Sequence, residues 1–296
     1  MHPIDGFASA FGEITLVLFT TLAPAGIVAY VIMALPLVVR GDGLGRDARR
    51  RLDAFLGMPV VVAMVGLVAS ATHLGNPANA LYIVAGLGRS PLSNEVVCGV
   101  AFLGAAGVFW LTSFSESGGN VALRRVAAAA VSCLGVVFLG AISLAYSADA
   151  IITWNSPLPV ASLWLNALAA GPLLAVLGFR LARLDAARGR GERWCVALAA
   201  AASAACIAVY AAWGAELAGM ENALAAARDL APAFGPMVGL FALLACAGVA
   251  LGAWGASPAR RAPRWALVAS PACVLAGVFV MRFAFYMVHM TAGLGV

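Results

Sequence analysis

Eight apolar stretches, each about as long as a lipid bilayer is thick, run through most of this chain. A helix needs about 20 residues to cross the hydrocarbon core, and it satisfies its own backbone hydrogen bonds there. The sequence therefore predicts an all-α, polytopic membrane protein: a bundle of eight transmembrane helices that forms a single domain, residues 1–296. The predicted spans are 11–40, 52–73, 94–114, 125–147, 159–183, 193–218, 234–256 and 264–293.

The low content of charged residues excludes an ordinary soluble domain. Charged residues make up 10% of the sequence, whereas a typical soluble domain has about 25%. Residues 1–12 contain no Arg or Lys, and the apolar run that follows is longer than the core of a signal peptide. We therefore expect this run to be the first membrane helix and not a cleaved leader.

The basic residues, all of them Arg, alternate between the loops. The first, third, fifth and seventh loops are rich in Arg, the other loops hold only Arg89 and Arg228, and the termini hold none. Because cytoplasmic loops carry the excess of positive charge, both termini are predicted to be periplasmic in a bacterial cytoplasmic (inner) membrane. This distribution explains the net charge of +5 without a nucleic-acid partner. The Arg-rich loops contain Arg40, Arg46, Arg49, Arg50, Arg51, Arg124, Arg125, Arg183, Arg188, Arg190, Arg193, Arg260, Arg261 and Arg264.

The six cysteines do not have the spacing of a metal or iron–sulfur site. None forms a Cys-x-x-Cys pair, and most lie within apolar runs, so they are interpreted as small buried hydrophobic residues. His73 and His289 lie near span ends, whereas the two axial ligands of a b-type haem usually lie mid-span on facing helices. We therefore expect no haem, iron–sulfur cluster or other metal site in this protein.

Ionisable residues near the apolar spans gather at one predicted membrane face. Charge in hydrocarbon is costly, so a one-sided cluster indicates a site and its side of the membrane. Arg180 is the exception, because it lies where a span meets the Arg-rich face. The clustered residues are Glu13, His73, Glu95, Glu216, Arg282 and His289.

His73 and Glu95 are the strongest candidates for chemistry. They flank the predicted loop 74–93, and a His–carboxylate pair can hydrogen-bond a hydroxyl group and accept its proton. Helix capping is the alternative explanation: Gly75 and Pro77 suit a helix end. Likewise, Ser93 or Asn94 could cap the next helix and place Glu95 in its first turn.

Arg282 lies within the last predicted span. Tyr286 and His289 follow at spacings of four and three, which puts the three residues on one helix face. A carboxylate partner is expected for an intramembrane Arg: Glu216 or Glu95, with Glu13 as a third candidate. The pair could be functional, or it could be structural and lock the bundle. Trp154, in a predicted periplasmic loop, is interpreted as an interfacial anchor.

Several ordered motifs resemble the membrane anchor subunit of dimethyl sulfoxide reductase, the DmsC-like family. They extend from the second to the eighth predicted span. The motifs are His73-Leu74-Gly75-Asn76-Pro77, Leu92-Ser93-Asn94-Glu95, Thr153-Trp154-Asn155-Ser156-Pro157, Gly171-Pro172-Leu173-Leu174, Gly214-Ala215-Glu216-Leu217-Ala218, Arg282-Phe283, Phe285-Tyr286, His289-Met290-Thr291 and Gly293.

This resemblance implies an anchor for a periplasmic molybdenum enzyme. Members bind and oxidise menaquinol and pass electrons to an iron–sulfur subunit, which feeds a molybdopterin catalytic subunit. The resemblance implies that His73 and Glu95 are quinol-site residues. Relatives can carry Arg where this sequence has Asn79, so any role of that Arg is in doubt here. The predicted quinone-binding set is His73, Gly75, Pro77, Ser93, Glu95, Glu216, Arg282, Tyr286 and His289.

Two other functions stay open at this stage. One is an anchor of a related quinone-coupled complex, of the polysulfide-reductase or haem-b type. The other is a proton or solute transporter, although transporters usually place ionisable groups at the midplane on broken helices. In the favoured interpretation the protein supplies a quinol-oxidation site without acting on the terminal substrate, and the sequence does not identify that substrate or the quinone type.

Overall fold

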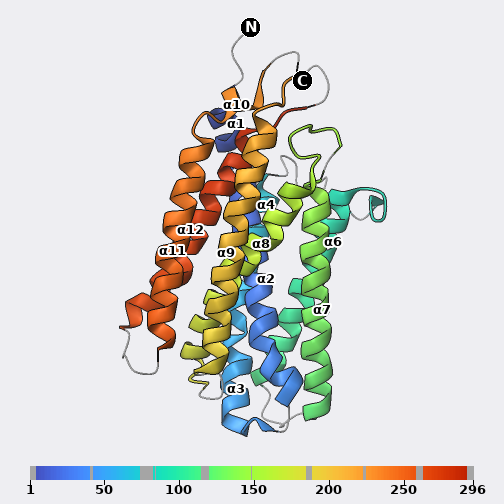
Figure 1. Cartoon of the computed structure of the whole chain (residues 1–296). Coiled ribbons are helices and arrows are strands. Elements are labelled where there is room, and N and C mark those ends of the chain that lie inside the picture. The colour runs from blue at the N-terminus through green and yellow to red at the C-terminus, as the bar shows by residue number, and fades with distance from the viewer. Residues whose placement is uncertain are drawn as a thin grey trace.

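The computed structural model describes residues 5–40, 43–73, 83, 85–114, 120–147, 149–184, 189–222, 225–257 and 263–291. Within these ranges, eight helical segments are long and apolar enough to cross a membrane, which confirms the predicted all-α polytopic class. Figure 1 shows them as a bundle of roughly parallel rods. The helices are α1 (Gly6–Gly12), α2 (Ile14–Arg40), α3 (Arg46–Phe55), α4 (Gly57–Thr72), α6 (Pro91–Leu111), α7 (Val121–Ala145), α8 (Pro157–Leu181), α9 (Arg190–Leu217), α10 (Ala227–Leu230), α11 (Phe234–Ala256) and α12 (Arg264–Met287), with the 3-10 turn η3 (Thr112–Phe114).

Two helices form the centre of the bundle. α2 packs against α4, α7, α8 and α12, and α8 packs against α2, α9 and α12. Their most apolar windows are 56% and 67% buried, more than those of any other described span. On the two sides of this centre, α6 pairs with α7, and α11 pairs with α12 and α9 (Figure 1). The polar residues of the first and last spans are thereby brought together in the interior.

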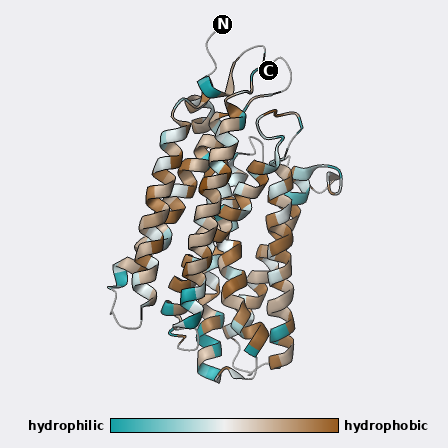
Figure 2. Cartoon of the chain, viewed as in Figure 1, coloured by the Kyte–Doolittle hydropathy of each residue, from teal (hydrophilic) through white to brown (hydrophobic). Residues whose placement is uncertain are grey.

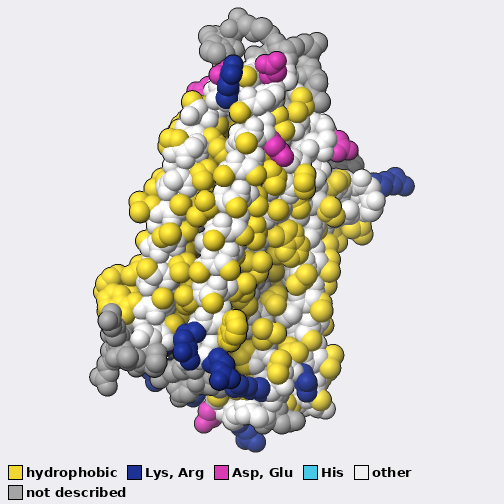
Figure 3. Space-filling model, in the orientation of Figure 1, with side chains coloured by type: hydrophobic (Ala, Val, Ile, Leu, Met, Phe, Trp, Pro, Cys, Tyr) yellow, Lys and Arg dark blue, Asp and Glu magenta, His cyan; other side chains and the backbone are white. Residues whose placement is uncertain are grey.

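The two ends of the bundle differ in charge. Apolar residues cover its middle, and polar residues gather toward the ends (Figure 2). In Figure 3 most dark blue Arg side chains lie at the lower end, where α3 and the start of α9 are, and most magenta acidic side chains lie at the upper end. Helix α1 and the C-terminal end of α12 both lie at the upper end in Figure 1, as expected for an even number of spans. The membrane side that each end faces stays a prediction.

Two helix boundaries differ from the sequence prediction and matter for the site. α6 begins at Pro91 and not at residue 94, because Ser90 is the N-cap: its side chain accepts a hydrogen bond from the Ser93 N–H at 3.4 Å. The last helix ends at Met287 and not at residue 293. Beyond it the backbone pairs with the α7–α8 loop, where the Ile152 N–H donates to the Met290 carbonyl at 3.0 Å.

Trp154 is not an interfacial anchor, so that interpretation was wrong. Its side chain is 6% exposed and stacks on Phe285, with ring centroids 4.2 Å apart. The indole N–H donates to the Phe285 carbonyl at 3.1 Å, and the neighbouring Thr153 hydroxyl donates to the Val288 carbonyl at 2.6 Å. The Trp213 indole in turn donates to the Thr153 carbonyl at 3.2 Å. The motif therefore joins the α7–α8 loop to α9 and to the end of α12.

The cysteines are less uniformly buried than the sequence suggested. All six are free thiols, but only Cys195 and Cys206 are buried. Cys133 and Cys246 are exposed on the apolar surface of the bundle. A helix surface that faces lipid and one that faces other helices are both apolar. Hydropathy therefore did not distinguish a lipid-facing cysteine from a buried one.

Gly26 allows the closest approach between α2 and α4. A Cβ atom there would lie 2.7 Å from the Pro59 carbonyl oxygen and 2.8 Å from the Ala63 nitrogen. Because both atoms belong to backbone, we expect Gly26→Ala to cost about 1–3 kcal/mol and to lower the unfolding temperature in detergent. Gly140→Ala is the matched control: it lies in α7 with no atom within 4 Å of an added Cβ. The control should be neutral or slightly stabilising, and an equal loss in both variants would contradict the packing argument.

Candidate functional site

Glu95 is a buried carboxylate that has no hydrogen-bond partner among the described residues. It lies in the second turn of α6, since the helix begins at Pro91, and its side chain is 0% exposed. Neither carboxylate oxygen has a partner within the described part of the protein. The alternative explanation, in which Glu95 lies in the first turn and is stabilised by the helix dipole, therefore does not apply. Such a group does not contribute hydrogen bonds to the fold, so it calls for another explanation.

Tyr146 contacts residues of the last span and interacts electrostatically with Glu95. It lies directly after α7, and its ring meets that of Tyr286 at 6.1 Å. Burial raises the pKa of the Tyr146 phenol well above its ordinary value; Tyr286 and Glu95 raise the pKa further, and Arg282 lowers it. These four residues, Glu95, Tyr146, Arg282 and Tyr286, are called the inner group below.

Arg282 is held by a hydroxyl and by aromatic rings. Its side chain is 1% exposed, and its Nε donates to Thr20 Oγ1 of α2 at 2.9 Å. The guanidinium lies over the Phe285 ring, 4.0 Å from the centroid. No described carboxylate forms an ion pair with it, contrary to the expected Glu216 or Glu95 partner, and its Nη2 has no hydrogen-bond partner among the described residues. The cation–π contacts partly replace the missing carboxylate.

Glu216 lies apart from Arg282. It is exposed near the end of α9, where it accepts a hydrogen bond from the Ser156 hydroxyl at 2.9 Å. Ser156 is also the N-cap of α8 and accepts from the Leu158 N–H at 3.3 Å. The described contact of Glu216 therefore supports the start of α8.

The partner of His73 is Glu13. His73 is the C-cap of α4, and its Nε2 lies 3.3 Å from Glu13 Oε2, at the junction of α1 and α2. Both side chains are partly exposed. No contact between His73 and Glu95 is found in the described residues. The pair that the sequence suggested, between α4 and α6, is thus replaced by one between α4 and the α1–α2 junction.

His289 is at least partly exposed, like His73 and Glu13, at this end of the bundle. It lies beyond the end of α12, so the helix face expected to join it to Arg282 and Tyr286 does not extend that far. Its ring lies 5.0 Å from that of Trp154, and this partial burial lowers its pKa, whereas nearby Glu13 raises it. His73, Glu13 and His289 are called the outer group below.

The two groups lie at different depths of one end of the bundle. Glu13 and Thr20 are seven residues apart on the α2 side, which is about 10 Å along a helix axis. Ser93 is buried near the start of α6, two positions before Glu95. Gly75 and Pro77 lie outside the described residues, and so does Asn79.

Sequence reasoning missed three features of this arrangement. Tyr146 and Thr20 are ordinary residues in apolar spans, and only the packing of α2, α7 and α12 brings them to Arg282. The third feature is that Glu13, a candidate partner for Arg282 in the sequence, pairs with His73 instead. The available signal was its place just before the long apolar run that forms α2. In the described ranges no cluster of three or more His, Cys, Asp or Glu side chains could hold a metal ion.

A helical bundle with eight membrane-crossing segments and a buried polar group at one end defines a multi-pass membrane protein. Its sequence matches the model of the family described as "DMSO reductase anchor subunit (DmsC)" over residues 7–288, and the protein belongs to that family. The match confirms the resemblance carried by the motifs.

Relatives agree over nearly the whole sequence. The C subunit of the anaerobic dimethyl sulfoxide reductase of Escherichia coli (strain K12) is 31% identical over 293 residues, which are 97% of this protein and 99% of the relative. The YnfH subunit of an anaerobic dimethyl sulfoxide reductase, also from Escherichia coli (strain K12), is 28% identical over 96% of this protein and 97% of its own length. The C subunit of the Haemophilus influenzae reductase is 28% identical over 55% of this protein and 57% of its own length.

Proposed function

We propose that this protein is the quinol-oxidising membrane anchor of a periplasmic molybdenum oxidoreductase of the dimethyl sulfoxide reductase type. It takes menaquinol from the bilayer and passes electrons to an iron–sulfur subunit, which feeds a molybdopterin catalytic subunit. The observation that carries the proposal is Glu95, a fully buried carboxylate with two unpartnered oxygens in the described structure. Membership of the anchor family supports the partners.

The inner group suits the chemistry of a hydroquinone. Menaquinol becomes menaquinone when it loses two electrons and two protons; the electrons leave to the iron–sulfur subunit. Glu95 accepts a hydrogen bond from one quinol hydroxyl and then takes its proton, because its oxygens have no competing donor among the described residues. The Arg282 guanidinium, with Nη2 unpartnered in the same ranges, stabilises negative charge on the quinol oxygen as that proton leaves.

The outer group provides the route between this interior and water. His73 binds the second quinol oxygen, and its ion pair with Glu13 offers a second carboxylate to receive a proton. His289 is held near Glu13 at the same end of the bundle. Glu216 supports the α8 N-cap and therefore acts on the site only through the fold.

The site lies toward the periplasm in this proposal. Arg residues gather at the opposite end of the bundle, and the positive-inside rule assigns that end to the cytoplasm of a bacterial inner membrane (Figure 3). Protons from the quinol then leave on the side where reduction of the terminal substrate consumes them. Such a cycle moves no net charge across the membrane.

Replacement of His73 by Ala tests the proposal in the assembled complex. We expect quinol-driven reduction of the terminal substrate to fall by about 100-fold or more, because a proton-accepting side chain at the reacting oxygen is lost. Reduction driven by an artificial soluble donor, which enters at the partner subunits, should persist. His73 and its partner Glu13 are both partly exposed, so the protein should still fold when this contact and the α4 cap residue are changed.

Glu13→Gln provides a graded comparison to the His73 variant. It keeps the size of the side chain but removes the charge that faces His73. We expect an intermediate loss of quinol-driven activity. Unchanged quinol-driven activity in His73→Ala would refute the assignment of this residue.

A further inference from the structure

A pocket with a basic mouth lies at the end of the bundle opposite to Glu95. It occupies about 930 Å³ between α3, α6, η3 and α7. Arg46, Arg49, Arg50 and Arg124 line it, with Asp53 as the one acidic residue. The pocket shares no residue with the inner or outer group. It is therefore a separate feature that the proposed function does not use.

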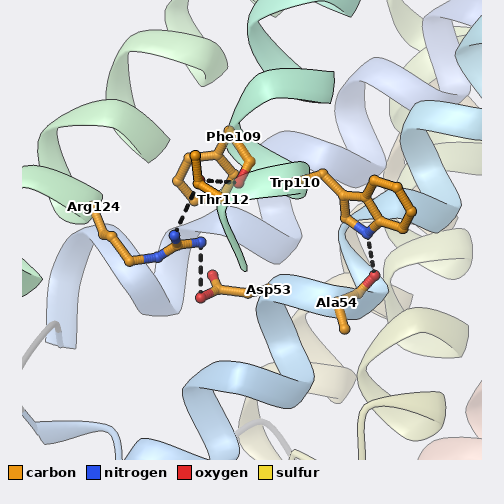
Figure 4. A network of polar contacts seen from close by, with 6 residues as sticks. All are labelled: Asp53, Ala54, Phe109, Trp110, Thr112 and Arg124. Carbon is orange, nitrogen blue, oxygen red and sulfur yellow. Dashed lines mark hydrogen bonds and ion pairs between the residues drawn. The ribbon is translucent and has the colours of Figure 1, made fainter. Parts of the chain in front are cut away.

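One of the four Arg side chains is already neutralised and fixes the base of the pocket. Arg124 Nη2 lies 2.9 Å from Asp53 Oδ2, and Nη1 donates to Thr112 Oγ1 at 3.3 Å (Figure 4). Its guanidinium covers the Phe109 ring at 4.6 Å. Nearby, the Trp110 indole donates to the Ala54 carbonyl at 2.8 Å, which ties α6 to α3 (Figure 4).

The other three Arg side chains carry positive charge without a direct ion pair in the described part of the protein, although Arg49 interacts with Asp53 at longer range. Arg46, Arg49 and Arg50 follow one another along α3, and none forms an ion pair with another described residue. Arg49 donates through Nη2 to the Leu44 carbonyl at 3.3 Å, while its buried Nε has no hydrogen-bond partner in the described ranges. The mouth of the pocket therefore has guanidinium donors available for an anion.

Above this mouth the pocket continues as an apolar groove between α6 and α7. Gly104 and Ala105 keep the α6 wall low, and Ala130 and Leu134 form the α7 wall. From Arg124 to Leu134 the groove follows ten residues of α7, about 15 Å of helix. Val108, at the edge, is 63% exposed on the apolar surface of the bundle, so the groove opens toward the bilayer.

We propose that this pocket binds an anionic phospholipid. The phosphate lies against Arg46, Arg49 and Arg50, and an acyl chain lies in the groove between α6 and α7. A basic mouth alone would suit any anion, and an apolar groove alone would suit any hydrocarbon. The two together, at the membrane interface, match a molecule that has both parts.

Native mass spectrometry of the detergent-extracted protein tests this proposal with two probes of equal acyl composition, phosphatidylglycerol and phosphatidylethanolamine. We expect one phosphatidylglycerol to be retained saturably, and phosphatidylethanolamine to bind on the order of tenfold more weakly. Arg49→Gln with Arg50→Gln should reduce phosphatidylglycerol affinity by on the order of tenfold or more. Arg125→Gln with Arg264→Gln is the matched control, because it removes the same charge at the same end from residues outside the pocket.

A variant that fills the apolar groove but keeps the Arg residues provides a second test. Val108→Trp places a large ring at the edge of the groove and leaves every Arg residue in the sequence, and we expect it to weaken lipid retention while α3 stays basic. Equal binding of the two lipids, or equal losses in the two double variants, would overturn the proposal in favour of diffuse surface charge. Displacement of the bound lipid by inorganic phosphate or by menaquinone would overturn it in favour of an ion site or a quinone site.

Discussion

Replacement of Glu95 by Gln is expected to remove quinol-driven turnover, by about 100-fold or more, while the thermal stability of the protein stays the same or rises. Glu95 is buried without a hydrogen-bond partner in the described structure. Its burial therefore lowers the free energy of unfolding, because no described contact offsets the loss of hydration. Gln has nearly the same shape as Glu, but its neutral amide cannot take up a proton as a carboxylate does. A loss of function with a gain of stability is the signature of a residue kept for chemistry.

The same complex provides the controls. Reduction of the terminal substrate by an artificial soluble donor should be unaffected in Glu95→Gln, because those electrons bypass the membrane site. Glu221→Gln makes the same chemical change at an exposed position toward the same end of the bundle, and it should leave quinol-driven turnover unchanged. Unfolding temperature in detergent is measured for both variants. A large drop in the stability of Glu95→Gln would contradict the argument and indicate a structural role.

Hydropathy was sufficient to predict the eight spans but not their ends. Burial in lipid or in protein demands the same apolar composition, so the interior of every span was evident. The start of α6 depended on a local choice between Ser90 and the equally plausible Ser93 or Asn94. The end of α12 is set by pairing with a loop more than 130 residues earlier, through Thr153 and Val288. Capping chemistry alone does not distinguish such cases.

The structure places the candidate residues that it describes toward one end of the bundle, as the sequence predicted, but it pairs them differently. Glu95 was recognisable in the sequence because a carboxylate in an apolar span is energetically unfavourable whether it faces lipid or protein. Arg282 was expected to find a carboxylate, yet its neighbours are the Thr20 hydroxyl and aromatic rings. Those groups are common in apolar helices and carry no charge signal in a sequence. The His73–Glu13 contact likewise depends on how α4 meets the α1–α2 junction.

Glu192→Ala is expected to cause the largest loss of stability, about 3–5 kcal/mol, because it leaves the Arg180 guanidinium without its anion. The two side chains join α8 to α9 at the Arg-rich end, with Arg180 Nε 2.6 Å from Glu192 Oε1 and Nη2 donating to Oε2 at 2.6 Å. Glu192 is 0% exposed. Unfolding in detergent mixtures, followed by fluorescence, measures the loss, and Glu221→Gln again serves as the exposed control.

The double variant Arg180→Met with Glu192→Leu separates a broken ion pair from an essential one. Removal of both charges eliminates the desolvation cost as well as the attraction, so most of the stability should return. The contact with α11 would still be missing, because Arg180 Nη2 also donates to the Gly255 carbonyl at 2.9 Å, in the last turn of α11. We therefore expect the double variant to remain about 1 kcal/mol below the parent. If the double variant is as unstable as Glu192→Ala, then the ion pair itself stabilises the packing of α8, α9 and α11. The loss in Glu192→Ala would then not be due to an unpaired Arg180 charge.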